Sequence, residues 1–268
     1  MTMKHAESQA LIEFTRRQSN LNHFLWTTEL VYGIVKQRKI LEKYPKNDQA
    51  WKALSRVRAE AWFPSAKGRG QGDVKGSIKY KGTIGEMRQQ LDENFVIVLW
   101  SVAAMFVAEF ERYIEARFPR WVARQTRDAW TVPAPAALLK SLCEVYKTNT
   151  SENIDPGTTL KADLMKKIRN LYVHKGLGGI PRKVDDPEIK SWIKFITKGS
   201  SPYSADQANS VVRYVIGGAV DRSRAATKDG KQLGEEFFYA LFTLTNIRNF
   251  ALALDANFPA DLRKESPN

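Results

Sequence analysis

The longest uninterrupted pattern in this sequence runs from Gly85 to Phe118 and is closed by Pro119. Apolar side chains within it recur at the three- and four-residue spacing of an α-helix. They fall on or near one stripe, which holds Phe95, Leu99, Val102, Phe106 and Tyr113. A long helix with a single apolar stripe is stable only when other helices cover that stripe. The segment therefore predicts the central helix of an α-helical bundle.

The rest of the chain adds further helical segments and shows no alternation of strands with helices. Helical spacing is expected at residues 7–43, 47–62, 136–146, 161–175, 186–196, 211–216 and 235–254. We therefore predict an all-α protein in four parts. These are an N-terminal helical extension (1–66), a basic Gly-rich linker or short hairpin (67–85), a helical bundle (86–260) and a C-terminal tail (261–268).

The charge of the chain points to a polyanionic partner. Lys and Arg number 42 against 29 Asp and Glu, which gives a net charge of +13. Lysines facing phosphates release counterions, so this surplus favours nucleic acid, although a basic soluble protein without such a partner stays an alternative. In the Gly-rich segment, Lys75, Lys79 and Lys81 are candidates for an arm that contacts RNA; the alternative is a solvated linker.

The sequence gives no sign of a metal, a cofactor or a membrane span. Cys143 is the single cysteine, and the three histidines are far apart without the spacing of metal ligands. The N-terminus has no apolar core of a signal peptide. The most apolar stretch, residues 95–108, is shorter than a bilayer requires. We expect a cytoplasmic protein that needs neither metal nor cofactor.

One short segment carries residues suited to phosphate chemistry. Asn170 and His174 are four positions apart, which places them on one face of a helix, and the long side chain of Arg169 can reach the same end. An imidazole titrates near neutral pH and can accept or donate a proton. A guanidinium matches phosphate oxygens and stabilises negative charge. The alternative is that the three residues share a helix by chance.

The pattern Arg169-Asn170-x-x-x-His174 resembles the signature of the HEPN superfamily. That family also carries an acidic residue on an earlier helix, and Glu111 stands at the matching place within Phe110-Glu111-Arg112-Tyr113-Ile114. The resemblance implies a HEPN-like helical bundle from roughly Gly85 to Pro259.

The resemblance also implies a function. HEPN ribonucleases cut single-stranded or transfer RNA without metal and leave a 2′,3′-cyclic phosphate. They generally act as homodimers, often in toxin–antitoxin or phage-defence systems with an antitoxin or defence partner protein. Other members bind RNA or assemble without catalysis, which is the alternative here.

By that resemblance Arg169 holds the phosphate, Asn170 orients the site and His174 transfers protons. Either Glu111 or Glu109 supports Arg169, and the sequence does not choose between them. Cations around the motif are candidates for further RNA contacts: Lys166, Lys167, Lys175, Arg182 and Lys183. For the lysines near the helix end, compensation of the helix dipole is the alternative.

Overall fold

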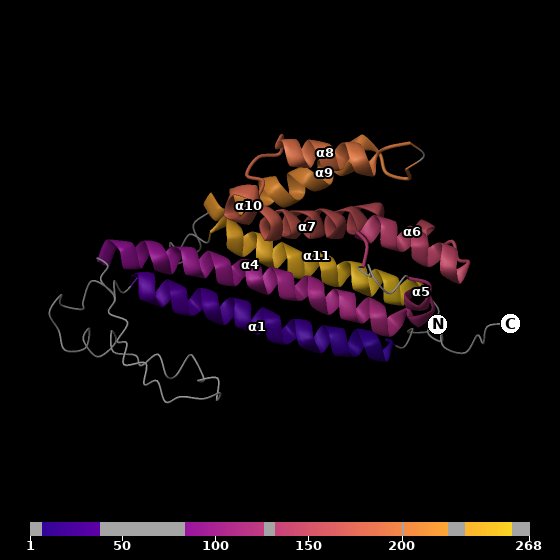
Figure 1. Cartoon of the computed structure of the whole chain (residues 1–268), viewed down its shortest axis with the longest axis horizontal. Helices are drawn as coiled ribbons and strands as arrows, with labels where there is room; N and C mark the ends of the chain where they lie inside the picture. Colours follow the sequence, from indigo (N-terminus) through magenta and orange to yellow (C-terminus); the bar gives the residue numbers. More distant parts are fainter. Residues whose placement is uncertain (1–6, 38–83, 126–131, 200, 225–233, 259–268) are drawn as a thin grey trace, which may run out of the picture. The chain divides into compact units, whose positions relative to one another are not determined.

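The computed structural model describes residues 7–37, 84–125, 132–199, 201–224 and 234–258. All regular elements in these ranges are helical, which confirms the all-α class for the described part of the chain (Figure 1). The predicted helix at 47–62 and the Gly-rich segment, with Lys75, Lys79 and Lys81, lie outside the described residues. The elements are α1 (Gln9–Gln37), α4 (Ile84–Arg117), α5 (Pro119–Ala123), α6 (Pro135–Tyr146), η3 (Thr150–Glu152), α7 (Pro156–Lys175), η4 (Gly176–Gly179), α8 (Pro187–Ile196), α9 (Ala205–Val212), η5 (Arg213–Gly217), α10 (Gly218–Arg224) and α11 (Glu235–Asn257).

The chain forms two compact units, one of residues 1–26 with 96–268 and one of residues 27–95. In the smaller unit, the ring of Tyr32 stacks on that of Phe95 with 3.9 Å between centroids. The first part of α1 belongs to the larger unit, where Leu11 and Phe14 are buried in the core. The first part of α1, which was expected within an N-terminal extension of residues 1–66, therefore packs in the larger unit.

In the larger unit, α7 packs between α11 on one side and α9 on the other, and α6 lies at its N-terminal end. From Val96 onward, α4 runs along α7 and α11, and the first part of α1 covers this part of α4 from the outside (Figure 1). All of these helices contribute buried side chains to the core. The largest fully buried ones include Leu25, Trp100, Phe106, Phe110, Tyr239 and Phe250. The motif helix α7 is thus an inner element of the bundle.

A buried carboxylate joins both ends of the larger unit. Asp255 near the end of α11 accepts hydrogen bonds from the backbone N–H of Ser8 (2.9 Å) and from its hydroxyl. It also accepts one from Nε of Arg117 (2.8 Å), and both members of this ion pair are almost fully buried. Because a buried charge is stable only when it is paired and hydrogen-bonded, this network fixes the N-terminus of α1 against α4 and α11.

Two helices, Glu93–Arg117 within α4 and Glu235–Asn257, are long and apolar enough to cross a membrane. The expectation that the apolar stretch of α4 is too short to span a bilayer therefore does not hold for the helix as it is. Both helices supply core residues of the bundle, for example Phe106 and Phe250, and this role accounts for the same composition.

The helix expected at residues 211–216 is part of a longer one. It begins at Ala205, capped by Ser204 whose side chain and that of Gln207 form a capping box, and it continues through α10 to Arg224. Residues 213–217 are wound as a π-helix, which interrupts the regular period. Sequence periodicity detected only the part in which Val211, Val212 and Ile216 face the core.

Candidate functional site

The motif lies in the last turns of α7. This helix begins at Pro156 rather than at residue 161, because the carboxylate of Asp155 caps it and accepts a hydrogen bond from the backbone N–H of Thr158 (2.7 Å). The buried face of the helix carries Leu160, Leu164 and Ile168. The packing of this face fixes how the following residues are directed.

Gly176 ends the helix directly after the motif, and Gly179 lies in the turn that follows. Gly176 has φ +64° and donates its backbone N–H to the carbonyl of Tyr172, so α7 stops at Lys175 as predicted. At Gly179 an added Cβ would stand 2.7 Å from the carbonyl oxygen of Leu171 and 2.5 Å from Cβ of Lys175. The 3₁₀ turn η4 therefore lies tightly against the helix end that carries His174.

Arg169 and Asn170 are brought together, and His174 is exposed beyond them. Nη1 of Arg169 donates a hydrogen bond of 2.9 Å to Oδ1 of Asn170, and both residues are half-buried. Nε of Arg169 is buried and has no hydrogen-bond partner among the described residues. His174 lies one turn beyond Asn170 on the same helix face, open to solvent and without a hydrogen bond to either residue in the described structure. A guanidinium, an amide and an imidazole thus lie on one open helix end.

The acidic residues expected to support Arg169 have other partners. Glu111 pairs with Nζ of Lys166 (3.0 Å). Glu109 pairs with Arg17 of α1 (3.1 Å) and with Arg112 on its own helix (2.6 Å). Neither alternative left open by the sequence is therefore realised in the structure. Glu111 nevertheless lies beside the motif helix, as expected, because it contacts Lys166 of α7.

Lys166 is an internal residue, contrary to the expectation that it contacts RNA. Besides pairing with Glu111, its ammonium donates to the backbone carbonyls of Val132 and Pro133. Burial lowers the pKa of Lys166, and the neighbouring charge of Glu111 opposes this effect. A buried lysine that joins two helices and a connecting segment is a structural element rather than a phosphate ligand.

The other expected cations lie on the surface near the motif, and most already have partners. Glu188 at the start of α8 pairs with Lys167 (3.5 Å) and with Lys175, whose hydrogen bond lowers the pKa of this carboxyl. Arg182 pairs with both Glu235 and Glu236 at the start of α11, and Lys183 is exposed. Exposed ion pairs of this kind are weak, so a phosphate can compete for these cations.

An aromatic column that the sequence analysis missed holds the motif in place. The ring of Tyr172, inside the motif, stacks on Trp100 of α4 (centroids 4.9 Å apart), and Trp100 in turn stacks on Tyr239 of α11 (5.9 Å). The hydroxyl of Tyr239 donates to the carbonyl of Pro181, just after η4 (2.8 Å). The column therefore fixes the motif helix and the segment that follows it. Its only sequence signal is an aromatic residue between Asn170 and His174.

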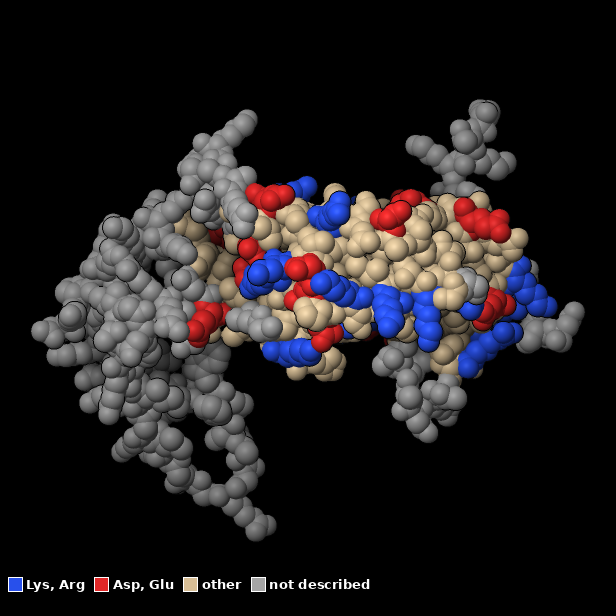
Figure 2. Space-filling model, turned by 90° about the horizontal axis from the view of Figure 1, so that it is seen from above, with Lys and Arg blue, Asp and Glu red and all other residues tan. Residues whose placement is uncertain are grey.

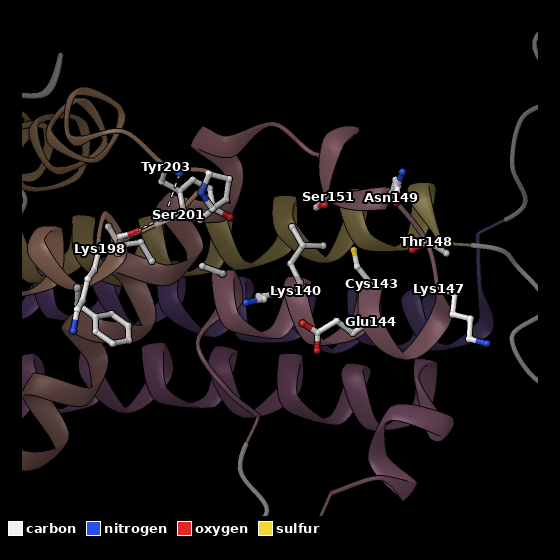
Figure 3. Close-up of a pocket in the computed structure, with 15 residues that line it drawn as sticks. Lys140, Cys143, Glu144, Lys147, Thr148, Asn149, Ser151, Lys198, Ser201 and Tyr203 are labelled. Carbon is white, nitrogen blue, oxygen red and sulfur yellow. Dashed lines mark hydrogen bonds between the residues drawn. The ribbon is translucent and has the colours of Figure 1, made fainter.

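A second feature, a groove of about 720 Å³, lies between α6 and the segment that follows α8 (Figure 3). None of the motif residues lines it. Its wall combines three lysines, one glutamate, and several hydroxyl and amide groups: Lys140, Lys147, Lys198, Glu144, Thr148, Asn149, Ser151 and Ser201. Sequence analysis assigned no role to this region.

Figure 2 shows Lys and Arg side chains gathered in a row along one edge of the face seen from above.

Comparison with known proteins gives no support for or against a function of the motif. No protein-family model, curated protein or solved structure matches the chain. Among the described residues, no group of three or more His, Cys, Asp or Glu side chains is placed to hold a metal ion. Arg169, Asn170 and His174, at the open end of an inner helix, are the arrangement from which a function can be argued.

Proposed function

We propose that this chain is a metal-independent endoribonuclease of HEPN type that acts in the cytoplasm as a homodimer. The observation that carries the proposal is an exposed imidazole, His174, one turn from the hydrogen-bonded pair of Arg169 and Asn170. The resemblance of this segment to the HEPN signature supplies the reaction. A role in a toxin–antitoxin or phage-defence system, with an antitoxin or defence partner, rests on that resemblance alone.

In the reaction the 2′-oxygen of a ribose bonds to the adjacent phosphorus while its hydroxyl proton leaves. The bond from phosphorus to the 5′-oxygen breaks, and that oxygen takes up a proton. The products are a 2′,3′-cyclic phosphate and a 5′-hydroxyl. His174 is suited to these proton transfers because an imidazole ring can accept a proton at one nitrogen and donate one from the other. A second copy of the chain in the proposed dimer would supply a second imidazole.

Arg169 stabilises the charge that develops on the phosphate. Its buried, unpaired Nε is a costly donor, and a phosphate that draws the guanidinium outward would satisfy it. Asn170 accepts a hydrogen bond from Nη1 and so holds the guanidinium one helical turn before His174. This division of roles leaves Glu111 out of the chemistry, since its partner is Lys166.

The test is cleavage of total RNA and transfer RNA in EDTA, with the ends of the products analysed for cyclic phosphate. His174→Ala should lower the cleavage rate by about 10²–10⁴-fold and leave RNA affinity nearly unchanged, because the imidazole moves protons. His23→Ala, an exposed histidine on α1, is the matched control and should cut at the wild-type rate. Equal cleavage by both variants, or none by the wild type, would reject the enzyme.

The second candidate is a non-catalytic RNA-binding or assembly module. The row of basic side chains in Figure 2 favours it independently of His174. It predicts RNA binding by the wild type without product formation. Arg169→Ala separates the two further, since it should reduce both binding and cleavage in the enzyme but only binding in the module.

A further inference from the structure

The exposed side of α8 carries lysines in register. Lys190 and Lys194 are both exposed and four residues apart, which places them on one side of the helix with about 6 Å of rise between them. Lys198, also exposed, follows two residues after the helix end and lines the groove against α6. Cations repeating at this interval suit the successive phosphates of a polynucleotide strand.

The groove continues this basic side of α8. Figure 3 shows Lys140, Glu144 and Lys147 along α6 and the turn after it, with Lys198, Ser201 and Tyr203 across from them. The charged side chains of the lining are three lysines and one glutamate, so the groove has an excess of positive charge. Its hydroxyl and amide groups can accept or donate hydrogen bonds to sugars and bases.

Phe195 gives the groove a selective feature. Its side chain is 74% exposed although it lines the groove, and it lies between Lys194 and the Ile196 that anchors α8 in the bundle. An aromatic ring open to solvent beside lysines is the arrangement on which unpaired bases stack. Duplex RNA hides the faces of its bases, and an acidic peptide would leave the ring unused.

The helix α8 connects this groove with the motif. Its first turn holds Glu188, which pairs with Lys167 and Lys175 of the motif helix, and its last turn ends at the groove. We propose that the lysine side of α8 and the groove between α8 and α6 form a binding track for single-stranded RNA that leads to the end of α7. This proposal rests on RNA as the substrate of the proposed function, and it adds the surface that binds the strand.

The test measures binding separately from cleavage. A fluorescein-labelled oligouridylate is titrated with the full-length protein carrying His174→Ala, by anisotropy, between about 50 and 200 mM salt. The track variant adds Lys140→Ala, Lys194→Ala and Lys198→Ala. A control variant of equal charge adds Arg16→Ala, Arg213→Ala and Arg248→Ala, three exposed arginines outside the groove lining.

Three lost phosphate contacts at about 0.7 each should reduce the slope of log affinity against log salt by about 2 in the track variant. The control should keep most of the slope. Phe195→Ala alone should weaken binding at least about fivefold, and Phe195→Trp should restore it, because stacking needs only an aromatic ring. Equal loss of slope in track and control variants, no effect of Phe195→Ala, or equal binding of duplex RNA or polyglutamate would overturn the proposal.

The two proposals fail in different ways. If the wild type cuts no RNA but binding depends on the track residues, the nuclease is rejected and the track stands. For the cleavage assay, the three track substitutions are made with His174 intact. If the wild type cuts RNA and this variant cuts both long and very short single strands at the same rates as the wild type, the track is rejected and the nuclease stands.

Discussion

Replacing Lys166 with Met tests whether Glu111, the acidic residue near the motif, stabilises the fold through its ion pair with Lys166. The ammonium, with a side chain 9% exposed, holds Glu111 and the carbonyls of Val132 and Pro133. Removing one partner of a buried ion pair costs about 3–5 kcal/mol. Because Glu111 is 28% exposed and can regain water, the lower end, about 3 kcal/mol, is expected. At about 2–4 °C per kcal/mol, the melting temperature should fall by about 6–12 °C.

The assay is urea unfolding followed by circular dichroism, with Lys183→Met as the control at an exposed lysine. The control should stay within about 0.5 kcal/mol of the wild type. Glu111→Gln should cost less than Lys166→Met, since Lys166 keeps its two carbonyl acceptors, and the double variant should show a coupling of about 1 kcal/mol or more. A Lys166→Met protein as stable as the control would refute the reasoning.

The same variants address catalysis. Under the proposed function, Glu111→Gln should cleave RNA at nearly the wild-type rate per folded molecule, because Glu111 contacts Lys166 rather than Arg169. Loss of cleavage in a variant that remains as stable as the wild type would return Glu111 to the site.

Further predictions concern other charged groups. Burial raises the pKa of Asp163, so the folded state binds its proton more tightly than the unfolded state; this group therefore adds stability below about pH 4 that is lost as the pH rises through the raised pKa. The urea midpoint of the wild type, relative to that of Asp163→Asn, should then decrease as the pH rises from 4 to 7. At pH 7 the Asn variant should still be about 1–3 kcal/mol less stable, because Trp192 Nε1 and the backbone N–H of Ala136 donate to different oxygens of Asp163 and an amide has an acceptor at only one of these positions. Asp255→Asn should lower stability by about 3 kcal/mol in the same assay, because it removes the buried carboxylate that forms the ion pair with Arg117. Glu188→Gln should tighten RNA binding and steepen its salt dependence in anisotropy titrations, because Lys175 becomes free for phosphate; unchanged binding would show that this lysine lies off the RNA path.

Sequence periodicity predicted helices and their ends well where local signals decide them. Pro119, Gly176 and the Asp186–Pro187 pair each mark a helix boundary that the structure has, because proline and glycine restrict the backbone regardless of the rest of the chain. The start of α7 was placed too late because its first turn is polar, although Asp155 and Pro156 give the same boundary signal as Asp186 and Pro187.

Pairing across the bundle could not be predicted in the same way. Choosing between Glu109 and Glu111 as the partner of Arg169 would require knowing how α4 is rotated about its axis relative to α7. In the structure Glu109 pairs with Arg17 and Glu111 pairs with Lys166. Which lysines are exposed depends on the same rotation, so Lys166 and Lys167, adjacent in sequence, differ in burial. The groove was missed because its walls come from α6 and from the segment after α8, which are separated along the chain.

The carboxylate that joins Ser8 to Arg117 has a consequence for how the protein is made. Ser8 and Asp255 are 247 positions apart, so this contact cannot form before both residues have left the ribosome. Leu11 and Leu254 belong to the same core, so that core cannot close before residue 254 has been translated. Contacts so distant in sequence also slow folding. A chain translated only as far as α7 therefore lacks the helix α11 that packs beside the motif, and an activity that depends on this packing would begin only after α11 has been translated.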